Sequence, residues 1–284
     1  MSAFNLKKAY LSGTHDGKHW KLGKESEPSQ AIFPIFSEHD GKYRLHGTGF
    51  YISLNGLFVT AKHVAEDCRE INEIGHSIFL IHTFSNNQFC KRPIGRMSIH
   101  DHADVALGWP NQIIDNKTGK EFRGKCVSLD INYGMPGHKP KTLVGEPVVT
   151  YAYALHDIDN LSDPPRISVQ PQLYDGVVKE FYEASGPSIK LRPPYFRSSI
   201  HMHGATSGAP VINTEGNAMG IASSSYDGSP DVSFITPIER VLEMVLHQPT
   251  ASNESTASVT VVQWLAVQSA DLENDVTIPV TDIR

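Results

Sequence analysis

Cysteine is scarce in this sequence of 284 residues: there are three, Cys68, Cys90 and Cys126, at wide spacings. An odd number without a C-x-x-C pair fits neither a disulfide framework nor a zinc clip. We therefore expect a reducing, cytoplasmic setting. Each thiol is better explained as a small buried residue than as a nucleophile, because none has an activating context.

Long apolar runs and a basic excess are also missing. No segment approaches the ~18 apolar residues of a membrane span, and the N-terminus, M-S-A-F-N-L-K-K-A-Y, lacks the apolar run of a signal peptide. With 25 basic and 31 acidic residues the formal net charge is −6, which does not favour binding to phosphate backbones. We expect neither a membrane nor a nucleic acid as a partner.

Short segments in which apolar and polar residues alternate are frequent, and this pattern is typical of β-strands. The clearest lies in 46–64, H-G-T-G-F-Y-I-S-L-N-G-L-F-V-T-A-K-H-V, where the Asn-Gly pair at 55–56 predicts a two-residue hairpin turn. Gly47 and Gly49 in the first strand allow another backbone to approach closely. The second strand leads to His63, which we expect at the rim of a sheet.

Helical patterns are few. One turn of helix is possible at 64–67, and the one convincing helix is 237–247, with Thr236 and Glu239 as a capping box and Pro237 at its first position. Further strands are predicted at 31–36, 78–83, 90–99, 105–107, 148–155, 167–173, 177–181, 218–223 and 231–235.

The punctuation of the chain predicts one main domain with tails. Residues 1–30 form an N-terminal arm, 31–247 the main domain, 248–258 a Ser/Thr/Asn-rich linker and 259–284 a C-terminal tail. Within the main domain, 110–147 is rich in Gly, Pro, Asn and Lys, which indicates long loops that cross between two halves.

Three residues follow one another in the order His63, Asp104, Ser207. A histidine at a strand end, an aspartate in a turn and a serine in a loop are each ordinary when taken singly. Together they supply what acyl transfer requires: a nucleophile, a base that accepts and returns its proton, and an acid that orients the base. Their order is that of chymotrypsin rather than of subtilisins or α/β-hydrolases.

The flanking residues carry a family resemblance. T-A-K-H before and at His63 resembles the T-A-x-H of trypsin-like peptidases, D-V-A-L at Asp104 resembles their D-[IV]-A-L, and G-A-T-S-G-A-P around Ser207 resembles their G-[DN]-S-G-[GSA]-P. The resemblance covers roughly 31–247 and is closest in style to compact bacterial members of HtrA type and glutamyl-endopeptidase type.

The resemblance implies an all-β fold of two antiparallel six-stranded barrels, at about 31–115 and 140–236, followed by the C-terminal helix. It also implies a serine endopeptidase that needs no metal or organic cofactor and acts on a protein or peptide substrate. His63 would be the general base and acid, Asp104 its orienting carboxylate and Ser207 the nucleophile. The N–H groups of Ala205 and Ser207 would form the oxyanion hole.

Two residues depart from the family pattern. Ala205 replaces the usual glycine, and its Cβ can hinder the backbone conformation that aims the N–H at the oxyanion. This departure motivates an alternative, a catalytically inactive pseudoprotease that binds a peptide or a partner. Thr206 replaces the aspartate that pairs with a freed N-terminus in secreted zymogens, so that mode of activation is not expected.

Substrate contacts are also implied. Ser223, Ser224 and Ser225 align with the strand that pairs with the substrate backbone. His201, six residues before Ser207, would line the pocket for the residue that precedes the scissile bond, and with His203 it suggests an acidic or amide side chain.

Other readings remain open at this stage. The H-x-H-x-D spacing of His100, His102 and Asp104 matches part of the motif of metallo-β-lactamase-like hydrolases, but Val105 stands where another histidine is needed. The exposed linker at 249–258 would allow self-processing by a protease dedicated to its own tail. The tail itself could dock a protein partner.

Overall fold

The computed structural model describes residues 28–84, 89–114, 125–130, 143–188, 191–226, 229–249 and 256–266. Within the predicted N-terminal arm it also describes two short paired strands, β1 (Thr14–His15) and β2 (Trp20–Lys21), and a 3-10 turn, η2 (Pro28–Gln30). Most of the predicted crossover at 110–147 lies outside the described residues.

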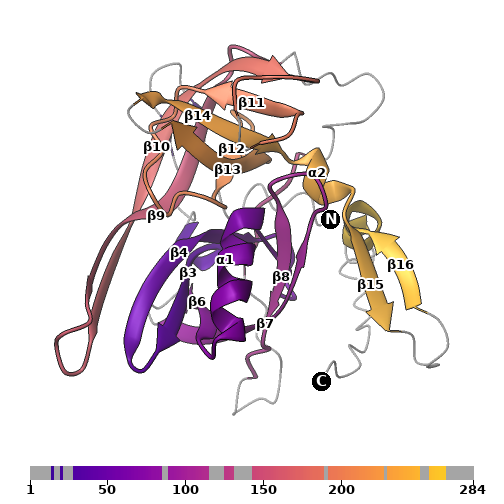
Figure 1. Cartoon of the computed structure of the whole chain (residues 1–284). Coiled ribbons are helices and arrows are strands. Elements are labelled where there is room, and N and C mark those ends of the chain that lie inside the picture. Colours follow the sequence, from indigo (N-terminus) through magenta and orange to yellow (C-terminus); the bar gives the residue numbers. More distant parts are fainter. Residues whose placement is uncertain are drawn as a thin grey trace.

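Twelve strands form two closed antiparallel barrels, which confirms the predicted architecture (Figure 1). The first barrel has the order β3-β4-β5-β8-β7-β6 and the second the order β10-β11-β14-β13-β12-β9. The first consists of β3 (Ile32–His39), β4 (Lys42–Tyr51), β5 (Phe58–Thr60), β6 (Ser77–Thr83), β7 (Phe89–Ile99) and β8 (Ala106–Pro110). The second consists of β9 (Pro147–Asp159), β10 (Arg166–Tyr182), β11 (Tyr195–Ser198), β12 (Pro210–Ile212), β13 (Ala218–Tyr226) and β14 (Ser229–Pro237).

The hairpin between β4 and β5 turns more widely than the predicted two-residue turn. β4 already ends at Tyr51, and the Ser53 hydroxyl accepts the N–H of Leu57 at 3.1 Å while the Ser53 carbonyl accepts that of Gly56 at 3.2 Å. Gly56 has a φ of 91°, which glycine adopts without strain. The side chain of Ser53 therefore closes the turn two residues before the Asn-Gly pair.

The helix after β5 is longer than the single turn predicted at 64–67. It is α1 (Lys62–Glu73), 12 residues long. Val64, Ala65 and Cys68 are buried, and Ile71 packs against the same cluster. This spacing of three to four residues makes one apolar face of a helix. The many polar residues between these positions made the helix hard to recognise in the sequence.

The helix predicted at 237–247 is wrong in extent. Helix α2 covers only Glu239–Leu242, and β15 (Val245–Pro249) follows, paired antiparallel with β16 (Thr256–Thr260). The capping box does not form because the Thr236 hydroxyl bonds to Ser223 Oγ at 2.7 Å. Val245 and Leu246 do not share a helical face: Val245 is 44% exposed and Leu246 only 4%.

This hairpin also changes the interpretation of the linker and tail. Residues 256–260 belong to β16 and 261–266 form a short helix, while 250–255 and 267–284 lie outside the described residues. Leu246, Val261 and Leu265 are buried in the main hydrophobic cluster. The tail up to 266 is therefore part of the folded domain.

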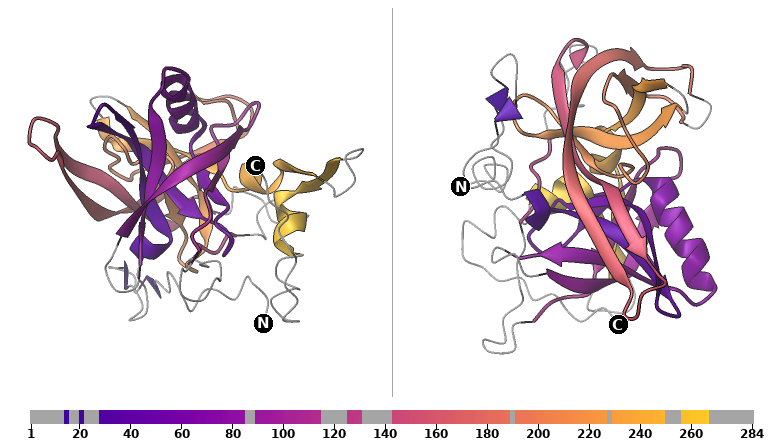
Figure 2. Two further views of the ribbon diagram at one scale, coloured as in Figure 1. Left: turned by 90° about the horizontal axis from the view of Figure 1, so that it is seen from below. Right: turned by 90° about the vertical axis from the view of Figure 1, so that its left-hand side faces the viewer.

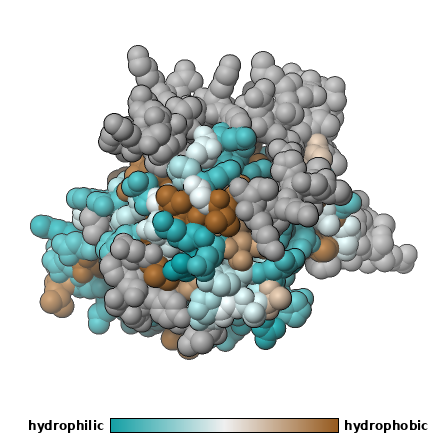
Figure 3. All heavy atoms as spheres, turned by 90° about the horizontal axis from the view of Figure 1, so that it is seen from above, coloured by the Kyte–Doolittle hydropathy of each residue, from teal (hydrophilic) through white to brown (hydrophobic). Residues whose placement is uncertain are grey.

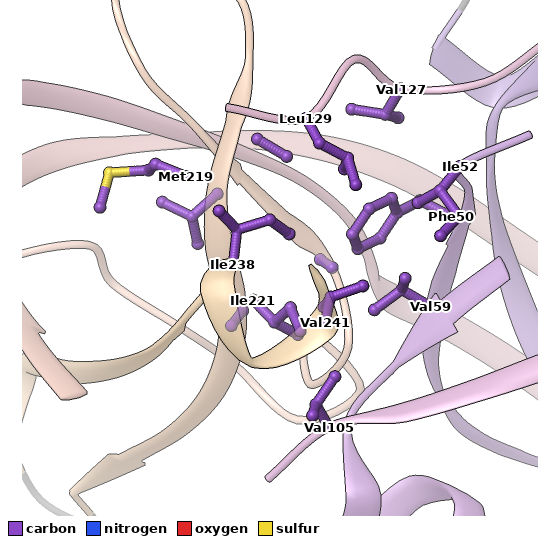
Figure 4. Packing of buried hydrophobic residues seen from close by; sticks show 14 of the residues in the cluster. Phe50, Ile52, Val59, Val105, Val127, Leu129, Met219, Ile221, Ile238 and Val241 are labelled. Atoms are coloured by element: carbon purple, nitrogen blue, oxygen red, sulfur yellow. The ribbon is translucent and has the colours of Figure 1, made fainter. Parts of the chain in front are cut away.

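That cluster joins the two barrels. Figure 4 shows Phe50, Val59 and Val105 of the first barrel and its loops close to Ile221 of the second and to Val241 of α2. A second cluster, with Phe33, Tyr51 and Phe58, lies inside the first barrel beneath α1. Because the larger cluster takes residues from both barrels, burial of apolar surface fixes one barrel against the other.

The hairpin of β9 and β10 reaches well beyond the second barrel. The strands predicted at 167–173 and 177–181 are one strand, β10, with register shifts where it pairs with β9 and with β11. Figure 2 shows this hairpin extending beside the first barrel, where the side chain of Asn160 bonds to the backbone N–H and C=O of Tyr43 at 2.8 and 3.1 Å. The hairpin thus adds polar contacts between the barrels.

Seen from the side of the second barrel, the coloured surface is largely hydrophilic, with apolar residues gathered near its centre (Figure 3). None of the helices within the described ranges has the length and apolar character needed to cross a bilayer.

The β15–β16 hairpin gives a test by paired substitutions. We expect Leu246→Ala to lower the free energy of unfolding by about 2–5 kcal/mol, because it leaves a cavity in the shared core. Val245→Ala should change it by no more than about 0.5 kcal/mol, because that side chain is largely in solvent. Chemical denaturation measures both. An equal loss of unfolding free energy in the two variants would contradict the assignment of these residues to a strand.

Candidate active site

The junction of β5 and α1 positions His63. It is the second residue of α1, and the N-cap residue, Ala61, has no side chain that can cap the helix. The backbone N–H of His63 instead donates to Asp104 Oδ1 at 3.1 Å. Asp104 therefore caps the helix from a different part of the chain, and its negative charge lies at the positive end of the helix dipole.

The same carboxylate holds the imidazole ring. His63 Nδ1 lies 2.9 Å from Asp104 Oδ1 and 3.1 Å from Oδ2. The Asp104 side chain is 11% exposed and that of His63 is 46% exposed. A carboxylate accepts hydrogen bonds, so the neutral ring carries its proton on Nδ1 and has its lone pair on Nε2.

A compact turn, the aspartate loop (residues 100–105), presents Asp104. His100 Nδ1 accepts the N–H groups of His102 and Ala103, both at 3.0 Å, and His100 Nε2 lies 3.0 Å from Glu243 Oε1. Lys62 Nζ donates to the carbonyls of His100 and Asp101 at 3.0 and 3.2 Å. Both nitrogens of His100 are thus engaged within the protein, which does not favour the metal reading of this motif.

The segment 203–209, here the serine loop, lies against β4 and the start of α1. The Ser207 carbonyl accepts the N–H of Thr48 at 2.9 Å. Gly208 has a φ of 90°, and a Cβ there would lie 2.1 Å from the Thr48 carbonyl oxygen and 3.0 Å from the N of Ala61. Only glycine fits this approach, which brings Ser207 next to the helix end that carries His63.

Gly47 makes room for the same contact from the other side. A Cβ on Gly47 would lie 2.8 Å from the Ser207 carbonyl oxygen and 2.7 Å from Val64 Cγ2. The close backbone approach predicted for Gly47 is therefore present. Gly49 instead lies against the side chains of Phe33 and Ile35, so it belongs to the core.

The hydroxyl of Ser207 donates to the carbonyl of Ser223 at 3.1 Å. If Ser207 acted as a nucleophile, its hydroxyl would have to exchange this bond for one to His63 Nε2. Hydrogen bonds of catalytic groups often align only when substrate binds.

Ala205 adopts the left-handed conformation, with a φ of 64°. This conformation costs a residue other than glycine about 1–2 kcal/mol. The Ala205 carbonyl accepts the Thr48 hydroxyl at 2.8 Å, and the next N–H, of Thr206, donates to the His203 carbonyl at 3.2 Å. Among the described residues no acceptor takes the N–H of Ala205 or of Ser207.

The predicted substrate residues occupy different environments. The Ser223 side chain is buried and bonds within the second barrel, so only its backbone faces the serine loop. Ser224 is half-buried on β13 and paired with β14, and Ser225 follows it on that strand. His201 is half-buried with its ring 4.3 Å from that of His203. Among the described residues no hydrogen bond or ring contact joins His201 to Ser207, so the role of His201 stays a prediction.

Burial keeps several other titratable groups of the first barrel and its loops uncharged. Burial raises the pKa of the Cys68 and Cys126 thiols to about 12, so neither is a nucleophile at neutral pH. Burial also lowers the pKa of His46, the neighbour of Gly47, to about 4, so this ring is uncharged at neutral pH. Thr206, in the place of the family aspartate, is 1% exposed.

Two residues that help to position the site, Thr48 and His100, were not predicted from the sequence to do so. Thr48 was visible only as the polar residue between the glycines of G-T-G-F, and its partners lie far along the chain. His100 was visible as part of a metal-like motif, whereas it organises the aspartate loop. The sequence did contain a signal for this role. His100 lies two and three residues before His102 and Ala103, at a spacing that lets a side-chain acceptor bond to backbone N–H groups in a turn.

Two six-stranded barrels, a His–Asp pair on the first and a serine loop on the second define the chymotrypsin-like class of fold. The family model of the trypsin-like peptidase domain matches residues 47–221, more than half of the chain. The protein belongs to this family, which confirms the resemblance noted in its motifs. No curated protein sequence matches the chain.

Solved structures are similar at low identity. The crystal structure of Deg5 has a TM-score of 0.52 and 17% identity, covering 75% of this chain and 86% of its own. The crystal structure of the MamO protease domain from Magnetospirillum magneticum, in its apo form, has a TM-score of 0.49 and 14% identity, covering 74% and 93%. At 17% identity, the likeness to Deg5 supports the fold alone.

The contact at Gly47 can be tested by adding one methyl group. We expect Gly47→Ala to slow the labelling of Ser207 by a fluorophosphonate at least tenfold, because the new Cβ displaces the Ser207 carbonyl. Gly95→Ala is the control, since the one close neighbour of its Cβ would be the side-chain oxygen of Asn111, at 2.9 Å, which can move, while the Trp109 carbonyl oxygen lies at an ordinary 3.7 Å. Labelling of Gly47→Ala within about twofold of the wild type would contradict the contact.

Proposed function

We propose that the protein is a serine endopeptidase that cleaves peptide bonds through His63, Asp104 and Ser207. The observation that carries the proposal is the pairing of His63 with Asp104 at the N-terminus of α1, next to the place where the serine loop lies on β4. Membership of the trypsin-like peptidase family supports the general activity.

In the proposed reaction Ser207 Oγ attacks the carbonyl carbon of the scissile bond while His63 Nε2 takes the hydroxyl proton. The C–N bond breaks as His63 returns this proton to the leaving amine, and an ester remains on Ser207. Water then attacks the ester, again giving a proton to His63. The acid product leaves as Ser207 regains its proton.

Asp104 stabilises this cycle without changing its own protonation state. It fixes the tautomer that leaves Nε2 free of its proton and offsets the positive charge that the ring acquires. The N–H groups of Ala205 and Ser207 would donate to the developing oxyanion. The loss of one such donor typically costs about 10²–10³-fold in rate. Every group that these steps require comes from the chain itself.

We further propose that an extended peptide binds along β13. On one side β13 pairs with β14 over most of its length. On its other side it pairs with β12 only as far as Ile221, opposite Pro210, so among the described strands none pairs with this edge beyond Ala222. A substrate strand could therefore add at Ser223 to Ser225. A substrate N–H directed at the Ser223 carbonyl would compete with the Ser207 hydroxyl and favour its turn toward His63. His201 would then contact the side chain before the scissile bond.

An intracellular setting is part of the proposal. It is supported by the free thiols of Cys68, Cys90 and Cys126, two of which are buried with strongly raised pKa values.

One observation favours a second candidate, the pseudoprotease that binds a peptide without cutting it. Ala205 lies in a conformation that strongly favours glycine, so the oxyanion hole carries strain that most family members avoid. Against it, the Ala205 carbonyl is held by the buried Thr48 hydroxyl at 2.8 Å, so this conformation has a specific support within the protein.

Fluorophosphonate labelling distinguishes the two candidates. We expect the wild type to be labelled, Ser207→Ala to be unlabelled, and His63→Ala to label at least about a hundredfold more slowly because it has lost its base. Ser162→Ala, an exposed-loop control, should label like the wild type. Absence of labelling in the folded wild type, in purified form and in cell lysate, would contradict the peptidase and favour the binding module.

A further inference from the structure

The serine loop, residues 203–209, is held in place by Thr48, a residue of the other barrel. Thr48 is fully buried on β4, and its backbone N–H donates to the Ser207 carbonyl at 2.9 Å. Its hydroxyl donates to the Ala205 carbonyl at 2.8 Å and accepts the N–H of Tyr153, on β9, at 3.2 Å. Its own carbonyl accepts the Thr60 hydroxyl at 2.8 Å.

The direction of the hydroxyl bond is fixed by its partners. The N–H of Tyr153 can only donate and the carbonyl of Ala205 can only accept, so the Thr48 proton must point at Ala205. The bond spans 157 residues of sequence, and its donor, Thr48, is fully buried. Loss of the hydroxyl would leave the part-buried Ala205 carbonyl without this donor.

This bond acts on the one strained residue of the site. The φ angle of Ala205 sets the relative orientation of the peptides on either side of its N–Cα bond. The N–H of Ala205 lies before that bond and the N–H of Ser207 after it. Together with ψ of Ala205 and the two torsions of Thr206, the φ angle of 64° therefore sets whether the two N–H groups converge on one point, as oxyanion stabilisation requires.

We propose that Thr48 is a positioning residue that holds Ala205 in its left-handed conformation and so maintains the oxyanion hole. The inference rests on the proposed peptidase function for its catalytic consequence, but not for the contact itself. Where a glycine would adopt the positive φ angle freely, this chain uses an alanine and tethers its carbonyl with a buried hydroxyl.

The test is a double-mutant cycle with Thr48→Val and Ala205→Gly, read by fluorophosphonate labelling of Ser207. We expect Thr48→Val to lower the maximal labelling rate at least tenfold and to change the half-saturating probe concentration by less than about twofold. Thr48→Ser, which keeps the hydroxyl, should label within about threefold of the wild type. In the Ala205→Gly background, the loss caused by Thr48→Val should shrink to less than about threefold.

Thr150→Val is the matched control. Thr150 is also fully buried, and its hydroxyl donates to the Pro210 carbonyl at 2.8 Å in the second barrel. This variant should lower the melting temperature as Thr48→Val does, yet label within about twofold of the wild type. The same loss of labelling from Thr48→Val in both backgrounds, or an equal loss from Thr150→Val, would overturn the inference.

Thermal unfolding keeps the inference testable if the wild type is not labelled, a result that would count against the peptidase alone. The drop in melting temperature caused by Thr48→Val should then be smaller in the Ala205→Gly background than in the wild-type background, because glycine releases the loop from its strain. Equal drops in the two backgrounds would overturn the link between Thr48 and Ala205.

Discussion

The contact between the serine loop and β4 is the constraint on which the site depends. The N–H and hydroxyl of Thr48 bond to Ser207 and Ala205, and Gly208 lies so close to β4 that no larger residue fits. The proposed nucleophile, Ser207, belongs to the second barrel, and the proposed base, His63, to the first. Their relative placement is therefore determined where these two backbones meet, and the shared hydrophobic core keeps the barrels in register.

Asp104 provides the second constraint on the site, because one carboxylate makes two different contacts. It caps α1 in place of Ala61, which has no capping side chain, and it orients the ring of His63. A helix end without a cap loses about 1 kcal/mol of stability. Stability of the helix and orientation of the His63 ring thus depend on one carboxylate, which His100 and Lys62 hold through the backbone of the aspartate loop.

The sequence predicted much of this arrangement because the informative signals are local. The flanks of His63, Asp104 and Ser207 indicated the family, and strand alternation indicated most of the barrels. The misses have long-range causes. Thr236 caps no helix because Ser223 takes its hydroxyl, and Thr48 finds its partner 157 residues away. Neither partner could be read from spacing, since both depend on strands that meet only in the folded chain.

The central claim is that Ala205, though not glycine, is held so that its N–H and that of Ser207 converge on one oxyanion. The most direct measurement is a crystal structure of the protein phosphonylated at Ser207. We expect Ala205 to keep a positive φ angle and the phosphonyl oxygen to lie about 2.7–3.1 Å from both nitrogens. A phosphonyl oxygen turned away from the Ala205 nitrogen, or an Ala205 relaxed to negative φ, would contradict it.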